Sequence, residues 1–470
     1  MGLKTKLTVN LWDIRLWITV FCVLRLFAIT NPPLEVAHNW RQTTVTMAAR
    51  NFLETDSNIL FPRVDFAGEK SGITGMEFPA LNYLVYLVSL LFGYEHWYGR
   101  LINLLITSIG TFFFFKCIKR FYGDNVAFNS TILLIVSVWF NYSRKIMPDT
   151  FAMAFVFMGL YFLTEYLYSK KGHSTLFLYF VFAGIGILSK LPSGYVLSLL
   201  GLFLFDNSVE KERKMKMTVV TLLIMGVVST YYFYWVPHLN SVYGFQHFFM
   251  GKGLIAGFSD TIGHMDQVLE KFYLEALQII GFILFLISLV YLMVVKNKQL
   301  LLPFIVLCVG FCIIIFKAGF AFYHHSYYII PFAPVMALVA GFGLSRLSNK
   351  TIVAVVLFAI GTESLLNKAN DYFIKDEEAA LIHLETELDK IGKREDLILI
   401  NSGKVPTPMY FAHRKGWIAD NSIFLNADTL RVMKSKGLKW VVVLKRTFGH
   451  NIMLNYKQRY TSKDFSIYEL

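Results

Sequence analysis

A polar segment between two apolar runs carries acidic and basic side chains at short spacing, which is an arrangement that can do chemistry. The ionisable residues of this segment, residues 30–99, include Glu35, His38, Arg41, Arg50, Arg63, Asp65 and Glu77. Such a set can supply a general base and ligands for a phosphate, or its members can pair with one another for stability. We favour function for the set as a whole, because ionisable groups beside a bilayer are costly unless they are used or paired.

Two other short motifs place charged side chains next to apolar runs. The sequence YSRKIMPD contains Arg144 and Asp149, and LSKLPSG contains Lys190. Asp149 falls in the first turn of a helix expected to begin at Pro148, where it either stabilises the positive helix end or faces a cavity. Lys190 either extends to the polar boundary of the membrane or joins the arginines in holding a phosphate.

The sequence FYHHSYYIIPFAP places His324, His325 and Tyr327 at the start of a further apolar run. Adjacent helical residues point about 100° apart, so the two histidines are a weak indication of a metal site. They belong either to a binding site or to a belt of aromatic residues at the membrane boundary. The four cysteines show no metal-ligand spacing. We predict no metal ligands and leave a divalent cation open as a cofactor.

Membrane helices must position these residues. The chain has 470 residues, of which 55% are hydrophobic and only 16% are charged, whereas soluble domains have about 25% charged residues. A soluble globular protein is therefore excluded. The net charge of +13 reflects basic cytoplasmic loops, so we expect no nucleic-acid partner. About eleven apolar runs are predicted to span the bilayer: 16–29, 100–115, 126–140, 150–168, 176–188, 195–205, 218–235, 273–295, 301–316, 327–344 and 352–366.

Residues 78–92 form an apolar run that we predict to be a juxtamembrane helix rather than a span. This assignment places the N-terminus and all of the strongly basic loops in the cytoplasm, namely 116–120, 170–171, 211–216, 296–298 and 346–350. Residues 30–99, 237–271 and everything after residue 367 then lie outside the cytoplasm.

The last hundred residues differ in character from the rest of the chain. Charged residues are frequent, and short apolar strands alternate with helical stretches, with strands expected at 397–400 and 440–444 and helices at 377–391 and 427–436. This alternation predicts a small α/β domain. We therefore expect a transmembrane domain over 1–369 and a soluble extracytoplasmic domain over 370–470.

Several of these motifs together resemble the protein O-mannosyltransferase superfamily of GT-C glycosyltransferases, which includes bacterial aminoarabinose transferases that act on lipid A. The matching segments are AARNF, EFPALNYL, SRKIMPD, LSKLPSG and HHSYYIIPFAP, together with the bacterial His-x-Trp-Arg-Gln pattern at residues 38–42. The resemblance implies an all-α polytopic membrane protein with a small C-terminal α/β domain. It also implies inverting transfer of a sugar from a polyprenyl-phosphate donor to a glycan, lipid or protein outside the cytoplasm.

The resemblance also implies roles for individual residues. A first-loop carboxylate would act as base, and a second acidic residue corresponds to Asp149. The usual Asp-Glu pair falls here on Arg41 and Gln42, which leaves Glu35 and Asp65 as candidate bases. The remaining candidates are substrate ligands: His38 and Trp40 for the sugar, Arg41, Arg63, Arg100, Arg144 and Lys190 for the phosphate, and Glu77 for fixing the loop or holding a cation.

Two other functions are compatible with the composition. A flippase or transporter of a lipid-linked glycan would show repeats or paired half-helices around a site at mid-membrane, and the sequence shows no repeat. A non-enzymatic scaffold would use its tail for binding. We favour the glycosyltransferase, and we expect it in the inner membrane of a bacterium.

Overall fold

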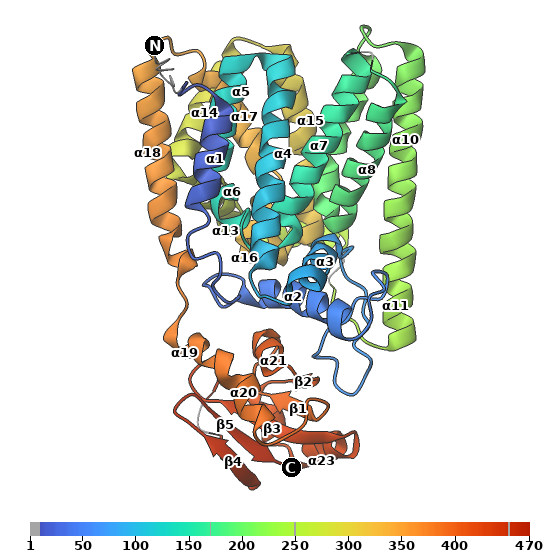
Figure 1. Ribbon diagram of the computed structural model, residues 1–470. Coiled ribbons are helices and arrows are strands. Elements are labelled where there is room, and N and C mark those ends of the chain that lie inside the picture. Colours follow the sequence, from blue (N-terminus) through green and yellow to red (C-terminus); the bar gives the residue numbers. More distant parts are fainter. Residues whose placement is uncertain (1–9, 170, 249–250, 450–451) are drawn as a thin grey trace, which may run out of the picture. The chain divides into compact units, whose positions relative to one another are not determined.

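The computed structural model describes residues 10–169, 171–248, 251–449 and 452–470 (Figure 1). The N-terminus and Lys170, both predicted to be cytoplasmic, lie outside the described residues. The chain divides into two compact units. The bundle unit comprises Met1–Ile29, Asn103–Val228 and Met250–Lys368, and the sheet unit comprises Thr30–Ile102, Ser229–Phe249 and Ala369–Leu470.

The bundle unit is built from helices, and each of the predicted spans contains at least one of them. The α-helices are α1 (Ile14–Leu24), α4 (Tyr98–Tyr122, which begins in the sheet unit), α5 (Asp124–Ile135), α6 (Trp139–Tyr142), α7 (Pro148–Tyr168), α8 (His173–Ser189), α9 (Leu200–Phe205), α10 (Lys211–Thr230), α12 (Leu254–Gly263), α13 (Met265–Glu270), α14 (Gln278–Val294), α15 (Lys298–Ala318), α16 (Phe320–His324), α17 (Ala333–Leu344) and α18 (Lys350–Lys368). Short 3-10 and π segments join some of them, namely η1 (Leu191–Leu199), η3 (Lys271–Ala276) and η4 (Ser326–Ile329).

Length and composition identify the helices that can cross a membrane without help from a neighbour. Among the described residues these are Tyr98–Tyr122, Pro148–Tyr168, Lys211–Tyr243, Lys298–Ala318 and Lys350–Tyr372, with a sixth if the bent pair Met265–Ala276 and Gln278–Val294 forms one span. The other apolar helices are shorter. The chain is thus an integral membrane protein, and the number of eleven spans stays a prediction.

Small residues let neighbouring helices of the bundle approach closely. A Cβ added at Gly186 of α8 would lie 2.7 Å from the backbone oxygen of Ala152 on α7, and one added at Gly341 of α17 would lie 2.2 Å from Ser130 Oγ on α5. Close contact through glycine is a common way for membrane helices to associate. Because α7 and α8 are consecutive and packed together, the start of α7 lies near the end of α8.

The sheet unit contains the predicted α/β tail. Its five strands are β1 (Leu397–Ile400), β2 (Gly416–Ile418), β3 (Leu438–Leu444), β4 (Lys457–Thr461) and β5 (Phe465–Glu469). They are ordered β2-β1-β3-β5-β4, with β1 parallel to β2 and β3 and with β5 antiparallel to β3 and β4. Both predicted strands are confirmed. The helical segments of the tail are η5 (Ala369–Tyr372), α19 (Asp376–Ala379), η6 (Ala380–His383), α20 (Leu384–Asp389), α21 (Thr407–Ala412), α22 (Asn421–Phe424) and α23 (Ala427–Ser435).

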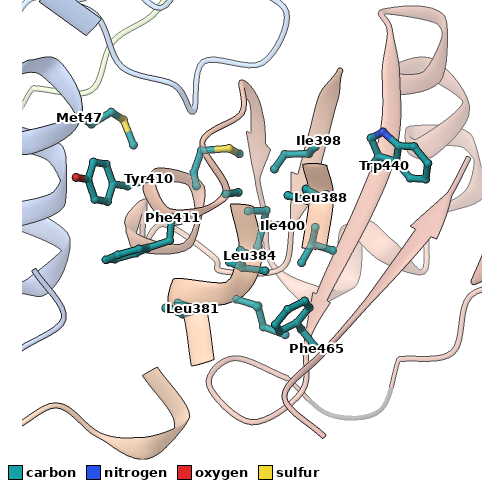
Figure 2. Packing of buried hydrophobic residues seen from close by; sticks show 14 of the residues in the cluster. Met47, Leu381, Leu384, Leu388, Ile398, Ile400, Tyr410, Phe411, Trp440 and Phe465 are labelled. Carbon is teal, nitrogen blue, oxygen red and sulfur yellow. The ribbon is translucent and has the colours of Figure 1, made fainter. Parts of the chain in front are cut away.

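The first loop contains a helix that the sequence analysis did not predict, α2 (Asn39–Glu54). Twelve consecutive residues of α2, from Arg41 to Phe52, are buried. The helix is polar on average and covered on all sides, so its sequence lacks the one-sided apolar pattern that reveals a surface helix. Figure 2 shows Met47 of α2 facing Tyr410 of the tail, within a cluster that also holds Ile398 and Ile400 of β1.

The predicted juxtamembrane helix is present as α3 (Ala80–Phe92). Its polar residues Asn82 and Ser89 are buried, whereas Leu91 and Phe92 are 78% and 74% exposed. The Asn82 side chain donates a hydrogen bond to the backbone oxygen of Val45 on α2, at 2.9 Å. The exposed apolar residues Leu91 and Phe92 suit contact with lipid. The sheet unit is completed by η2 (Tyr231–Trp235) and α11 (Val236–Tyr243).

Gly416 gives a first testable prediction. It has a φ of 155° and pairs with Ile398 of β1, whose backbone oxygen would lie 1.8 Å from an added Cβ. We expect Gly416→Ala to force the strands apart and to destabilise the sheet by about 1–3 kcal/mol. Faster deuterium exchange in residues 397–400 is the readout. Gly184→Ala, where an added Cβ meets nothing within 4 Å, is the control, and unchanged exchange in Gly416→Ala would contradict the prediction.

Candidate functional site

The bundle unit holds a buried ion pair at the start of α7. Asp149 lies in the first turn of this helix, as predicted, and its side chain is 4% exposed. Its Oδ1 atom lies 3.3 Å from Lys190 Nζ. Its Oδ2 atom has no hydrogen-bond partner among the residues that the structure describes. Buried acceptor atoms are nearly always hydrogen-bonded, so this oxygen is available to a ligand.

Lys190 follows α8 and brings together three motifs that are far apart in the sequence. Its ammonium group lies 5.4 Å from the ring centre of Tyr327 and 5.9 Å from that of Tyr328. Both tyrosines belong to η4, and Asp149 belongs to α7. The sequence predicted all three motifs at the same side of the membrane. The structure brings Asp149, Lys190 and Tyr327 into one cluster.

Other cations are buried in the segment that precedes α7. Arg144 donates a hydrogen bond to the backbone oxygen of Ala28 at 2.9 Å, and Arg25 donates one to Ser143. Arg25, Arg144 and Lys145 are each less than 5% exposed. Arg144 and Lys145 thus place positive charge in the same sequence motif as Asp149, and Arg25, which follows α1, contacts this motif.

Asn103 of α4 holds this segment in place. Its side-chain amide donates to the backbone oxygens of Lys145 at 2.7 Å and Tyr142 at 3.1 Å. Asn103 was not among the predicted site residues, since a single asparagine inside an apolar run carries no distinctive pattern. Its role is to fix the loop that bears Arg144 and Lys145.

The two adjacent histidines do not converge on one point. His324 is exposed, and its Nδ1 atom lies 3.0 Å from the backbone oxygen of Phe320. The ring of His325 stacks on Tyr327, with 5.2 Å between ring centres. Within the described part of the chain, no group of three or more His, Cys, Asp or Glu side chains is placed to hold a metal ion.

An apolar cavity of about 350 Å³ lies within the bundle unit. The α7 residues that line it recur every three or four positions: Met153, Phe157, Leu160, Thr164 and Tyr168. This spacing continues the helix face that starts at Asp149, and it covers a rise of about 22 Å along α7. Tyr195, Val196 and Leu199 of η1 and Val335 and Leu338 of α17 complete much of the wall. The cavity is thus lined by elements that follow Asp149, Lys190 and Tyr327.

In the sheet unit, Glu35 forms an ion pair with Arg100. The Oε2 and Nη2 atoms are 3.2 Å apart, and both side chains are 0% exposed. The Arg100 guanidinium also donates to the backbone oxygens of Asn31 and Pro32. Glu35 is therefore buried and paired with Arg100 in this structure. Its carboxylate would have to separate from Arg100 to act as a base.

Asp65 is also held by a cation. Its Oδ2 atom lies 3.2 Å from Arg50 Nη2, and its Oδ1 atom accepts from Asn51 Nδ2 at 2.8 Å. The Arg50 guanidinium lies 4.5 Å from the ring centre of Tyr410. Burial disfavours the charge on Arg50, but the carboxylate of Asp65 raises the pKa of this guanidinium. Asp65 therefore joins α2 to the rest of the sheet unit.

The remaining first-loop candidates form pairs within the loop or lie near the start of α2. Arg41 pairs with Glu77, and Arg63 pairs with Asp56 at 2.9 Å. His38 precedes α2 with a φ of 63°, and Trp40 is half-buried. The left-handed conformation of His38 is uncommon for a residue other than glycine, and such strain clusters at functional sites.

His247 lies close enough to Arg41 and Glu77 for their charges to affect its pKa. It was not among the residues predicted from the sequence. Burial, with the positive charge of Arg41 adding to it, lowers the pKa of its imidazole from 6.5 to about 4. Its ring packs against Phe66 with 5.3 Å between centres. No motif surrounds this residue in the sequence, so only the fold reveals it.

Comparison with known proteins addresses the family. Residues 77–235 match the model of the family described as dolichyl-phosphate-mannose-protein mannosyltransferase. The fold is similar to that of apo ArnT from Cupriavidus metallidurans, with a TM-score of 0.61 and 13% identity over 97% of this chain and 98% of that one. The chain therefore shares the fold of this membrane glycosyltransferase. No curated protein matches its sequence significantly.

The GT-C fold is shared by two further structures. ArnT from the same organism bound to undecaprenyl phosphate has a TM-score of 0.60 and 12% identity, with 97% and 98% of the two chains covered. AglB, an oligosaccharyltransferase from Archaeoglobus fulgidus in complex with an inhibitory peptide and a dolichol-phosphate, has a TM-score of 0.57 and 13% identity, with 92% and 70% covered. The predicted all-α polytopic GT-C fold with a small C-terminal α/β domain is confirmed.

Proposed function

We propose that this membrane glycosyltransferase moves a sugar from a polyprenyl-phosphate donor to a glycan, lipid or protein acceptor outside the cytoplasm, with inversion at the sugar carbon. The observation that carries the proposal is the buried pair of Lys190 and Asp149, which begins the helix face that lines an apolar cavity. This combination matches a ligand with a charged head and a hydrocarbon tail. We expect the enzyme in the inner membrane of a bacterium.

The cavity suits the tail of such a donor. Apolar surroundings favour hydrocarbon over water, and most of the residues that line this cavity are apolar. A polyprenyl chain that followed α7 from Asp149 would pass Met153, Phe157 and Leu160. ArnT in its complex with undecaprenyl phosphate and AglB in its complex with a dolichol-phosphate show that the same fold accepts lipids of this class.

The cations of the bundle unit suit the phosphate head. When the bond between the sugar and the phosphate breaks, the phosphate gains negative charge, and a fixed ammonium group nearby stabilises that charge. Lys190 is held by Asp149 and two tyrosine rings, so its position is set before the donor binds. Arg144 is the second predicted ligand in this unit.

Asp149 has a separate role in the proposal. Its Oδ2 atom, which has no hydrogen-bond partner among the described residues, would accept a hydroxyl hydrogen of the sugar. The acceptor base is assigned to the first loop, with Glu35 and Asp65 as the two candidates. Either would have to leave its arginine before it accepted a proton.

The other predicted ligands keep the roles that the resemblance implies. His38 and Trp40 would contact the sugar ring, since an aromatic surface suits the face of a pyranose, and Arg41, Arg63 and Arg100 would be further phosphate ligands. His324, His325 and Tyr327 would shape the donor side. A divalent cation stays open as a cofactor, and any direct role for it would be tested by adding a chelator to the transfer assay.

Transfer can be tested in the organism that makes the protein. A deletion strain should accumulate one lipid-linked sugar and lose the matching sugar from its envelope, as measured by mass spectrometry. Purified protein added to membranes of this strain should restore the transfer. A deletion strain with unchanged lipid-linked sugars and unchanged glycans would overturn the proposal.

The cavity gives a prediction about donor binding. Leu338→Trp would place a larger ring in the cavity and exclude at least two methylene groups of the tail. At about 0.8 kcal/mol per methylene, undecaprenyl phosphate should bind roughly tenfold more weakly. Native mass spectrometry of the purified protein gives the bound fraction. Leu286→Trp is the control, because Leu286 of α14 is 43% exposed and does not line the cavity. Equal weakening in both variants would argue against the tail site.

A further inference from the structure

One face of α2 is joined to the C-terminal tail along its whole length. The residues of this face recur every three or four positions, as expected for one side of a helix: Asn39, Thr43, Met47, Arg50 and Glu54. The side chains of Asn39 and Glu378 are hydrogen-bonded, and the hydroxyls of Thr43 and Thr407 are 3.2 Å apart. The tail therefore sets the position of α2.

His413 makes the last contact on this face, at the end of α2. Its Nε2 atom lies 2.7 Å from Glu54 Oε2 of α2, and its Nδ1 atom lies 2.7 Å from Glu385 Oε1 of α20. The His413 side chain is 13% exposed. A neutral imidazole has one N–H donor, whereas an imidazolium has two. Both contacts are hydrogen bonds to carboxylates only when each nitrogen of His413 carries a proton, as in the imidazolium.

The opposite end of α2 carries the residues proposed to bind substrate. His38 precedes the helix, and Trp40 and Arg41 lie in its first turn. Backbone hydrogen bonds keep the helix rigid, so the contact at Glu54 helps, together with the other contacts on this face, to set the position of the first turn.

We propose that the imidazolium of His413 positions α2 for sugar transfer, so that the transfer rate falls when this side chain loses its proton. This inference rests on the proposed function, but the contact between α2 and the tail can be measured without any substrate. His413 acts through α2 and is a positioning residue.

The charged groups around His413 set the direction of the pH effect. Burial disfavours the proton on His413, but the hydrogen bonds to Glu385 and Glu54 outweigh burial and raise its pKa above the usual 6.5. Arg50 opposes the proton, and Arg394 pairs with Glu385. The contact is therefore fully formed below pH 6.5, and it is lost as the pH rises through the raised value.

Two other ionisable groups lie close to this contact. Burial and the charge on Arg50 lower the pKa of His96 to about 4, so His96 stays neutral while His413 titrates. Arg414, the next residue, pairs with Asp389 and keeps its charge. We therefore assign any change in the contact between α2 and the tail from pH 6 to pH 9 to the titration of His413.

Hydrogen–deuterium exchange of the full-length protein in nanodiscs tests the contact. In the wild type, exchange in residues 51–56 should speed up by roughly twofold to fivefold between pH 6 and pH 9 after correction for the intrinsic rate, the range expected for a partly exposed ion pair. In His413→Gln, exchange should be fast at both pH values. His383→Gln is the matched control, because His383 is an exposed histidine of the same tail. A wild-type pH dependence that persists in His413→Gln would overturn the inference.

Glu54→Gln provides a second variant that keeps the histidine. It removes one of the two carboxylates, so the change in exchange should occur at lower pH than in the wild type. The pH at which sugar transfer falls, measured in membranes of the deletion strain, should likewise be lower in Glu54→Gln than in the wild type. Transfer with one pH profile in wild type, Glu54→Gln and His413→Gln would overturn the positioning role, whereas a wild type without transfer at any pH would overturn the proposed function instead.

Discussion

Replacing Lys190 with alanine is expected to slow sugar transfer by roughly 10²- to 10³-fold, the usual effect of removing one fixed electrostatic contact from a transition state. Lys190 lies against Asp149 and two tyrosine rings, so it can meet the phosphate without rearranging. The measurement is transfer in membranes of the deletion strain, together with binding of undecaprenyl phosphate. Lys252→Ala is the control, since Lys252 forms a more exposed pair with Asp260 elsewhere in the bundle unit.

A structural role for the pair can be separated from a role in transfer. Lys190→Ala leaves the Asp149 carboxylate buried without its cation, which lowers stability by itself. The double variant Lys190→Met with Asp149→Asn removes both charges and should recover the stability. If this double variant transferred sugar at the normal rate, the pair would be structural, and the proposed phosphate site would be wrong.

Replacing Glu35 with alanine should destabilise the sheet unit by about 3–5 kcal/mol, because it removes one partner of a buried ion pair. Both side chains of the pair, Glu35 and Arg100, are 0% exposed. A fall in the temperature of unfolding and faster deuterium exchange in residues 31–36 would report the loss. The control is Asp428→Asn, which removes one partner of a pair that is 79% and 87% exposed and should cost at most about 0.5 kcal/mol.

The same pair can show whether Glu35 is the base. Glu35→Leu combined with Arg100→Met replaces the ion pair by apolar side chains of similar volume, which commonly restores stability. Because Arg100 is itself a proposed phosphate ligand, the informative outcome is a double variant that is stable and still active. If it is stable and transfers sugar, the base is Asp65 or another group. A Glu35→Ala protein as stable as the wild type would contradict the structural part of the prediction.

Much of the fold could be predicted because its elements have clear sequence patterns. The apolar runs all contain helices, and strand 397–400 is found with the predicted bounds. Helix α2 could not be predicted, since it is polar and buried on all sides. The helix predicted over 377–391 is divided into α19, η6 and α20, because the charges alone do not show where a helix changes its winding.

The sequence could name residues of the candidate site, but it could not show which of them contact one another. The motifs around Asp149, Lys190 and Tyr327 could each be found in the sequence, and only the packing of α7, α8 and η4 shows that they meet. Conversely, nothing in the sequence pairs Glu35 with Arg100, since the two lie far apart along the chain. Whether a charge is used in chemistry or neutralised by a neighbour depends on such distant contacts, which one sequence does not contain.

The dependence of α2 on the tail has a consequence for biosynthesis. The ribosome makes α2 early and residues 369–470 after all of the bundle helices, so the early helix stays without its supporting surface until these residues have been made. A nascent or truncated product can thus insert its hydrophobic segments and still lack an ordered first loop. An ordered first loop therefore requires synthesis of the tail.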